Sequence, residues 1–183
     1  NISNCINKAL IAQSSGISAG GIIGALNSGK IENCLNEGRL EINSSGNEEG
    51  LGFIGGIIGR SESGEISECI NNGSINSNTS YVGGIVGDSN YIVTNCHNEA
   101  NIETDKDNNN NSCVGGIAGQ LSGNSSSEAK IENCYNTGMV YGKGNYVGGI
   151  VSICAGGDIT NSYNIGNIMS DTIIVGGIVG SVN

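Results

Sequence analysis

Apolar residues in this chain occur in short clusters of isoleucine and valine, separated by glycine, asparagine and serine. One cluster reads Gly-Gly-Ile-Val-Gly at residues 83–87. Near-copies of this segment begin at Gly20, Gly55, Gly115, Gly148 and Gly176. Short β-branched clusters bounded by turn-forming residues predict strands and turns rather than helices. The pattern therefore indicates an all-β chain.

A second segment, Ile-Glu-Asn-Cys-Tyr-Asn-Thr-Gly at residues 131–138, alternates with the first. Its copies begin at Ile2, Ile31, Ile66, Val93 and Ile159. Gly55 and Gly83 lie 28 residues apart, and so do Gly148 and Gly176. A unit this short must stack on its copies to bury its apolar side chains. We expect one parallel β-solenoid domain over residues 1–183, a right-handed β-helix by the usual crossover rule, with about six coils of roughly 28 residues.

Aligned copies separate inward from outward positions. Two columns are aliphatic in every copy and are predicted to point inward. They are Ile11, Leu40, Ile75, Ile102, Val140 and Ile168, and Ile22, Ile57, Ile85, Ile117, Ile150 and Ile178. Val82 and Val86 flank Ile85, which predicts a segment apolar on both faces that needs a cover from an insertion, a neighbouring chain or a partner.

Asparagine occupies the sixth position of the second segment in every copy. The column is Asn7, Asn36, Asn71, Asn98, Asn136 and Asn164. Asparagine tolerates the left-handed conformation of a sharp bend, and stacked amides can hydrogen-bond from coil to coil. We therefore expect this column to form both the bend and a structural ladder.

The cysteines favour neither disulfides nor a metal site. There are seven, an odd number, and five occupy one repeat position. Stacked in parallel about 4.8 Å apart, they would have Cβ directions unsuited to an S–S bond. No Cys-x-x-Cys spacing occurs, and the single histidine, His97, directly follows Cys96. We interpret the column as small buried apolar side chains, and Cys113 as a packing residue at the position that Phe53, Tyr81 and Tyr146 hold elsewhere.

Charge excludes some partners. Seventeen acidic and seven scattered basic residues give a net charge of −10, which disfavours nucleic acid and anionic membranes. No apolar run approaches the ~20 residues that span a bilayer. The chain has no initiator methionine or signal peptide and begins and ends within the repeat pattern, so we expect a segment of a larger protein.

Three insertions interrupt the plain repeat, near residues 39–53, 101–112 and 120–130, and are expected to form surface loops. In the second, Asp105, Asp107 and Asn109 have the alternate spacing of a calcium loop. Asn110 stands where that loop needs glycine, and Gly116 where it needs glutamate. A solvated loop without calcium is the preferred interpretation, and no cofactor is expected.

One column is a candidate binding surface. The residue after each column cysteine, or after Ser162 in the last copy, should point outward and becomes aromatic toward the C-terminus. The column reads Ile6, Leu35, Ile70, His97, Tyr135 and Tyr163. Exposed rings can stack on sugars or anchor a protein, which makes His97, Tyr135 and Tyr163 the candidate site. The simpler interpretation, which we prefer at this point, is an apolar stripe covered by the loops.

The segments Tyr-Val-Gly-Gly-Ile-Val-Gly at residues 81–87 and Ile-Thr-Asn-Ser-Tyr-Asn at 159–164 resemble the GLUG-motif repeat family, and the resemblance covers essentially the whole chain. It implies a secreted or wall-attached bacterial surface protein, often large and multidomain. Such repeats accompany immunoglobulin A1-cleaving metallopeptidases and adhesin-like proteins. This chain has no His-Glu-x-x-His motif, so peptidase activity would belong to another part of a larger protein.

The leading functional hypothesis is a non-catalytic extracellular module, a stalk or adhesin segment at the bacterial surface that contacts host protein or glycan. The alternatives are a polysaccharide-acting β-helix enzyme and an accessory segment of a secreted peptidase. Such an enzyme needs clustered carboxylates or a calcium–base pair. Glu32, Glu132 and Asp158 occur singly, with Lys30 and Lys130 as expected ion-pair neighbours.

Two further expectations concern surfaces. Ice binding needs a regular threonine array, and two glutamates interrupt the candidate column. That column is Ser3, Glu32, Ser67, Thr94, Glu132 and Thr160. Open terminal coils expose unpaired strand edges, which predicts end-to-end self-association of the isolated segment.

Overall fold

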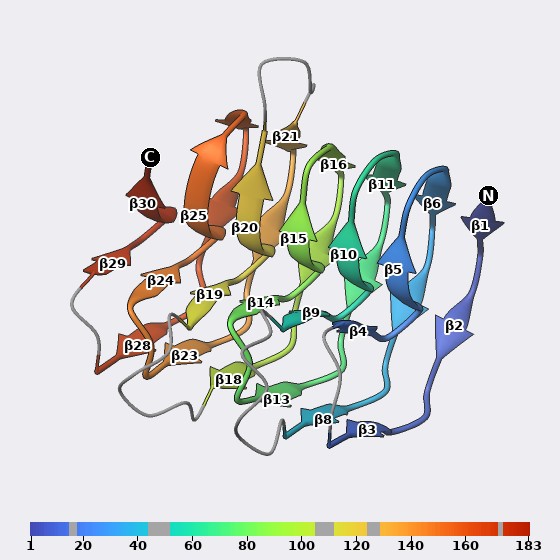
Figure 1. Cartoon of the computed structure of the whole chain (residues 1–183), viewed down its shortest axis with the longest axis horizontal. Helices are drawn as coiled ribbons and strands as arrows, with labels where there is room; N and C mark the ends of the chain where they lie inside the picture. Colours follow the sequence, from blue (N-terminus) through green and yellow to red (C-terminus); the bar gives the residue numbers. More distant parts are fainter. Residues whose placement is uncertain (15–17, 44–51, 105–111, 124–128, 172–173) are drawn as a thin grey trace.

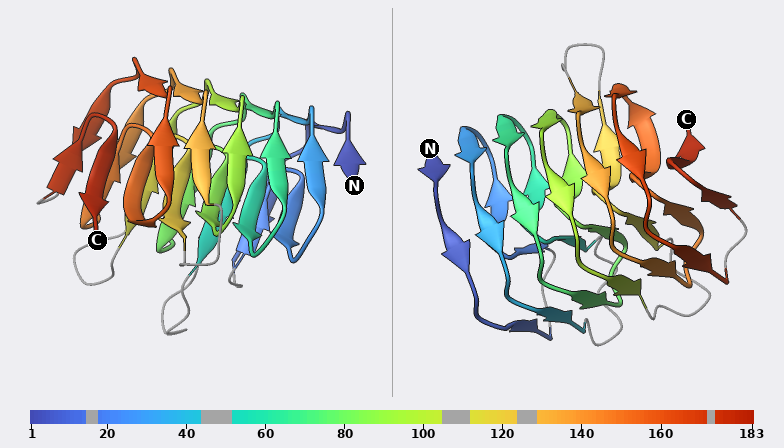
Figure 2. Two further views of the ribbon diagram at one scale, coloured as in Figure 1. Left: turned by 90° about the horizontal axis from the view of Figure 1, so that it is seen from above. Right: turned by 180° about the vertical axis from the view of Figure 1, so that it is seen from behind.

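The chain folds as a parallel β-solenoid of six coils, as the repeat pattern predicts (Figures 1 and 2). The computed structural model describes residues 1–14, 18–43, 52–104, 112–123, 129–171 and 174–183. These residues form thirty strands and no helix, so none of them lies in a helix that could cross a membrane. Each coil gives one strand to each of five six-stranded sheets, here called A to E in chain order.

The strands of the five sheets have the following bounds. Sheet A contains β1 (Ile2–Ser3), β6 (Lys30–Glu32), β11 (Glu65–Ser67), β16 (Ile92–Thr94), β21 (Lys130–Glu132) and β26 (Asp158–Thr160). Sheet B contains β2 (Ile6–Asn7), β7 (Leu35–Asn36), β12 (Ile70–Asn71), β17 (His97–Asn98), β22 (Tyr135–Asn136) and β27 (Tyr163–Asn164). Sheet C contains β3 (Ile11–Gln13), β8 (Leu40–Ile42), β13 (Ile75–Ser77), β18 (Ile102–Thr104), β23 (Val140–Gly142) and β28 (Ile168–Ser170). Sheet D contains β4 (Ser18–Gly20), β9 (Phe53–Gly55), β14 (Tyr81–Gly83), β19 (Cys113–Gly115), β24 (Tyr146–Gly148) and β29 (Ile174–Gly176). Sheet E contains β5 (Ile23–Leu26), β10 (Ile58–Ser61), β15 (Val86–Ser89), β20 (Ala118–Ser122), β25 (Val151–Gly156) and β30 (Val179–Val182).

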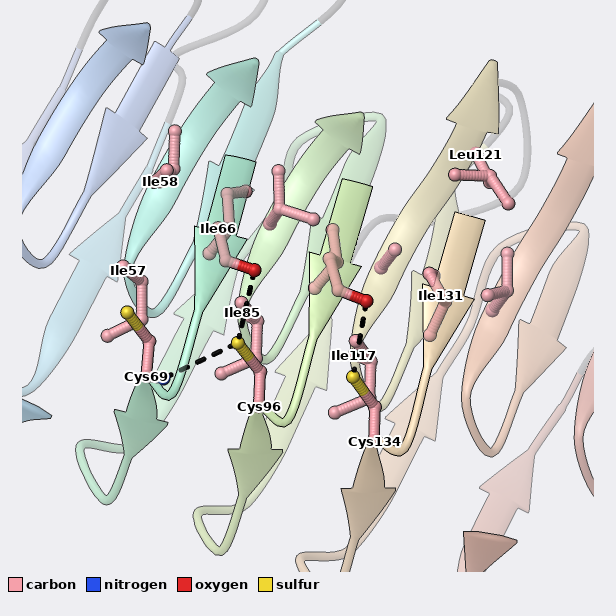
Figure 3. Packing of buried hydrophobic residues seen from close by; sticks show 14 of the residues in the cluster. Ile57, Ile58, Ile66, Cys69, Ile85, Cys96, Ile117, Leu121, Ile131 and Cys134 are labelled. Carbon is pink, nitrogen blue, oxygen red and sulfur yellow. Dashed lines mark hydrogen bonds between the residues drawn. The ribbon is translucent and has the colours of Figure 1, made fainter. Parts of the chain in front are cut away.

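The solenoid contains two separate apolar cores. One lies between sheets A and E and includes Ile66, Val86 and the column cysteines (Figure 3). The other lies between sheets C and D and includes Ile75 and Val82. Equivalent residues pair in register from coil to coil, so each inward column is continuous along the axis.

The two cores correct the expectation that an additional cover is needed for the segment apolar on both faces. Val82 and Val86 are both fully buried, but in different cores. The backbone turns between sheets D and E, so sheet C covers one valine and sheet A the other. The coil therefore supplies both covers itself.

A buried amide ladder runs along sheet B between the cores. The side chains of neighbouring column asparagines are joined by Nδ2–Oδ1 hydrogen bonds of 2.7–2.8 Å along all six coils. Asn36 also donates to the carbonyl oxygen of Gly38 (2.9 Å) and accepts from its N–H (3.2 Å). Its two donors and its oxygen lone pairs are thus fully used, which offsets the cost of burying an amide.

The predicted bend lies elsewhere than expected. The ladder asparagines are in extended strands, and positive φ angles of 49–57° occur three residues earlier, directly before the cysteine column. These residues are Asn4, Asn33, Glu68, Asn95, Asn133 and Asn161. The expectation was wrong because the inward amide needs a strand to align it with its neighbours, whereas the preceding corner needs the left-handed residue.

The Gly-Gly segment packs directly against this ladder. A Cβ on Gly84 would overlap the carbonyl oxygen of Gly116 and the side chain of Asn98. Gly56 and Gly116 stand in the same relation to Asn71 and Asn136. The two repeated segments are therefore linked, because the glycine makes room for the buried amide.

All seven cysteines are free thiols. Cys34, Cys69, Cys96 and Cys134 are buried in the core between sheets A and E, and the thiol of Cys96 contacts the carbonyl oxygen of Ile66 at 3.8 Å (Figure 3). Burial is the largest cause of a raised pKa for the Cys96 thiol. These thiols are therefore uncharged packing groups, as their repeat position predicts.

Candidate binding surface

The aromatic column lies on the outer face of sheet B. In each strand of this sheet the second residue is a ladder asparagine that points inward, so the first residue points outward. Asn98 and Asn136 are fully buried, whereas Tyr163 is 49% exposed. The structure therefore brings His97, Tyr135 and Tyr163 together on one surface, on β17, β22 and β27.

The three rings form a stack along the solenoid axis. Ring centroids of His97 and Tyr135 are 4.5 Å apart, those of Tyr135 and Tyr163 are 5.1 Å apart, and both pairs are within 6° of parallel. This spacing follows from the separation of about 4.8 Å between hydrogen-bonded strands. Both faces of Tyr135 are therefore occupied by its neighbours. A sugar can stack only on the outer face of Tyr163, and elsewhere the column offers ring edges.

The ends of the column are open to solvent. Ile6, which begins it, is 60% exposed, and Tyr163, which ends it, is 49% exposed. The central rings are half-buried because they cover one another. The preferred sequence interpretation, a stripe covered by loops, does not hold at these ends.

The column carries little charge of its own. His97 Nε2 lies 3.7 Å from Glu99 Oε1, but burial lowers the pKa of His97 and outweighs the opposing effect of Glu99. Burial also raises the pKa of the Tyr135 phenol, as do Glu99 and Tyr163 to a smaller extent. At neutral pH the imidazole and the phenol are therefore uncharged, and both can donate and accept hydrogen bonds.

Surface amides flank the same column. The Asn133 side chain donates to Asn95 Oδ1 at 3.3 Å, and that of Asn33 to Asn4 Oδ1 at 2.7 Å. A pocket of about 240 Å³ lies over the first coils. It is lined by Asn4, Ile6, Asn33, Cys34, Leu35, Glu68 and Ile70. Apolar groups beside a few polar donors and acceptors are typical of a recognition surface.

A second cluster was missed by the sequence analysis. The Arg60 guanidinium lies 5.1 Å from the Phe53 ring centroid, and that ring stacks on Tyr81 at 5.4 Å. Arg60 Nε is also 3.6 Å from Asp88 Oδ2. The signal was present, because Arg60 and Asp88 have opposite charges at equivalent positions 28 residues apart.

The acidic side chains of sheet A are paired with lysines. Lys30 Nζ lies 3.4 Å from Glu32 and 3.6 Å from Glu65, and Lys130 Nζ lies 2.9 Å from Glu132. The expected ion-pair roles of both lysines are confirmed. Within the described ranges, no group of three or more histidine, cysteine or acidic residues is placed to hold a metal ion. The calcium-loop candidates Asp105, Asp107 and Asn109 lie outside those ranges.

Comparison with known proteins identifies one motif. The family model of the GLUG motif matches residues 110–141, which include β20, β21 and β22. A search of curated proteins and a search of solved structures each found no match. Residues 110–141 thus carry the GLUG motif that the sequence resemblance predicted, in a chain whose coils repeat the same two segments.

Proposed function

We propose that this chain is a non-catalytic repeat module of a bacterial surface protein that binds an extracellular host protein or glycan through the column His97, Tyr135 and Tyr163. The observation that carries the proposal is the outward stack of neutral rings beside surface amides. The extracellular location and the adhesin role rest on the GLUG resemblance.

The geometry favours contact with ring edges over stacking on ring faces. Because Tyr135 is covered on both faces, its partner must approach from the side and exchange hydrogen bonds or apolar contacts with the edges. A protein surface meets this requirement along the whole column, and a glycan meets it through its hydroxyl groups, with one stacking position at Tyr163.

A non-catalytic role agrees with the pairing of the acids. A glycan-cleaving site needs carboxylates free to hold a proton or attack a sugar. Glu32, Glu65 and Glu132 on sheet A are instead engaged with lysines.

The test is a binding screen of the purified chain on a glycan array and a panel of host extracellular proteins. The variant is Tyr135→Ala/Tyr163→Ala. Tyr141→Ala is the matched control, since it removes the same residue type from β23, on the outer face of the neighbouring sheet. Circular dichroism verifies that each variant is folded.

Loss of a binding signal in the double variant, with retention in the control, is the expected result. A signal that survives the double substitution would assign recognition to another surface. No signal for the wild-type chain would contradict binding and indicate a passive spacer.

A further inference from the structure

The two ends of the solenoid are apolar, unlike its sides. Among the described residues, every large apolar side chain classed as exposed belongs to the first or the last coil. They are Ile2, Ile6, Leu10, Tyr163, Ile165, Met169, Ile174, Val175, Ile178 and Val182. Ile2, Val175, Ile178 and Val182 occupy columns that are buried in the middle coils. The end faces therefore expose the two cores in cross-section.

The amide ladder gives these ends opposite hydrogen-bonding character. Each ladder asparagine donates from Nδ2 to Oδ1 of the next coil, in one direction along the chain. At the last coil, Asn164 Nδ2 bonds only to the carbonyl oxygen of Gly166, which leaves one N–H unused. At the first coil, Asn7 Oδ1 accepts only the N–H of Ala9. One end thus offers a donor and the other an acceptor.

The remaining columns also match when the last coil meets the first. In-register continuation places Val175 against Ala19, Ile178 against Ile22 and Val182 against Leu26. Strands β26 to β30 and β1 to β5 are the outermost strands of their sheets and present unpaired backbone groups. Apolar groups meet apolar groups, and parallel ladders continue.

Charge does not oppose this contact. The chain carries −10 overall, but Lys8 is the single charged side chain among residues 1–29. Residues 157–183 contain two, Asp158 and Asp171. The ends therefore have opposite signs, and most of the like charge lies in the middle coils, beyond short range of the contact.

We propose that the C-terminal face of this 183-residue chain binds the N-terminal face of a second copy, so that Asn164 of one molecule donates to Asn7 of the next and the ladder continues. The contact is head-to-tail and unclosed, so it propagates into polar filaments. A head-to-head contact would oppose two acceptors at Asn7 and could not continue the parallel sheets.

The test uses two variants, each blocked at one end. Ile2→Lys places a charge on the N-terminal face and Val175→Lys on the C-terminal face, and both positions are already more than one-third exposed. Sedimentation velocity is measured on wild type, on each variant alone and on their equimolar mixture. Circular dichroism verifies that each variant is folded.

The expected result is a sedimentation coefficient that rises with concentration for wild type, monomers for each variant alone, and a one-to-one dimer in the mixture. Dimerisation of either variant alone would show a head-to-head contact and overturn the proposal. So would a wild-type chain that stays monomeric at all concentrations.

A second pair of variants tests the ladder without blocking an end sterically. Asn164→Asp removes the donor, and Asn161→Asp makes the same charge change at an exposed position of the same coil. Asn164→Asp is expected to weaken self-association about tenfold relative to Asn161→Asp, since the donor faces an unpaired acceptor. Equal weakening would contradict the ladder's part in the contact.

Discussion

At the residue scale, two positions of the repeat depend on each other. The ladder asparagine is buried and needs partners for every polar atom, and the second glycine of Gly-Gly-Ile leaves the space that it occupies. Neither residue is explained by its own propensity, because both are poor strand formers. Their contact is what makes them suitable.

The last coil provides a natural control for this contact. Gly84 and Gly177 occupy the same repeat position, but a Cβ on Gly177 would meet nothing within 4 Å. We expect Gly84→Ala to lower the free energy of unfolding by about 3 kcal/mol through overpacking, and Gly177→Ala to change it by less than about 0.5 kcal/mol. Urea denaturation followed by circular dichroism measures both.

Equal effects of the two substitutions would show that loss of glycine flexibility, rather than the contact with the ladder, controls stability. The sequence predicted the glycine column and the asparagine column separately. It did not predict their contact, because no spacing along the chain says which columns face each other across a coil.

At the element scale, the turn between sheets D and E brings a carboxylate under cover. Asp88, on β15, is 5% exposed, accepts a hydrogen bond from Ser122 Oγ at 2.8 Å and lies near Arg60. Burial raises the pKa of the Asp88 carboxyl, while Ser122 and Arg60 oppose the rise and Glu62 adds to it. Desolvation is the dominant effect at this site.

The raised pKa predicts how stability changes with pH. Folding favours the protonated carboxyl, so the stabilisation from Asp88 is complete below the pKa of the unfolded chain and is lost as pH rises through the folded pKa. Relative to wild type, Asp88→Asn should gain unfolding free energy between about pH 3 and about pH 7. Urea titrations of both proteins across this range measure the difference.

A companion variant defines the cause. Ser122→Ala removes a hydrogen bond that holds the pKa of Asp88 down, so the pH at which wild-type stability falls should move upward in this variant. If Asp88→Asn instead loses stability relative to wild type at neutral pH, the ion pair with Arg60 outweighs desolvation.

At the scale of the whole molecule, the coils form a row in which each contacts its neighbours. Every sheet has its six strands in chain order, so no coil is bypassed by its neighbours' hydrogen bonds. Stability in such a row is approximately a sum over coils and the interfaces between them. The two cores are both continuous along it.

Shortening the chain tests this additivity. Residues 1–156 retain five coils, and we expect them to fold with a urea m-value lower by about one-sixth and a lower midpoint. Cutting there exposes Ile150 and Val151 at a new end face. Failure of this shorter chain to fold would show that the six coils are one cooperative unit to which the last coil is essential.

The amino-acid sequence by itself determined the repeat, the number of coils and most inward columns. It could do so because each coil contacts copies of itself, so a period along the chain becomes a register between strands. Ile57, Ile85, Ile117 and Ile150 are fully buried, as that register requires.

The tertiary structure decided what depends on the path within one coil. The division into two cores, the left-handed corner before the cysteines, the pairing of Arg60 with Asp88 and the occupied faces of Tyr135 all follow from which sheets face each other and how far apart coils lie. Side-chain contacts across a coil join positions that no repeat period relates. The sequence therefore predicts which residues stack, and the folded coil determines what each stack touches.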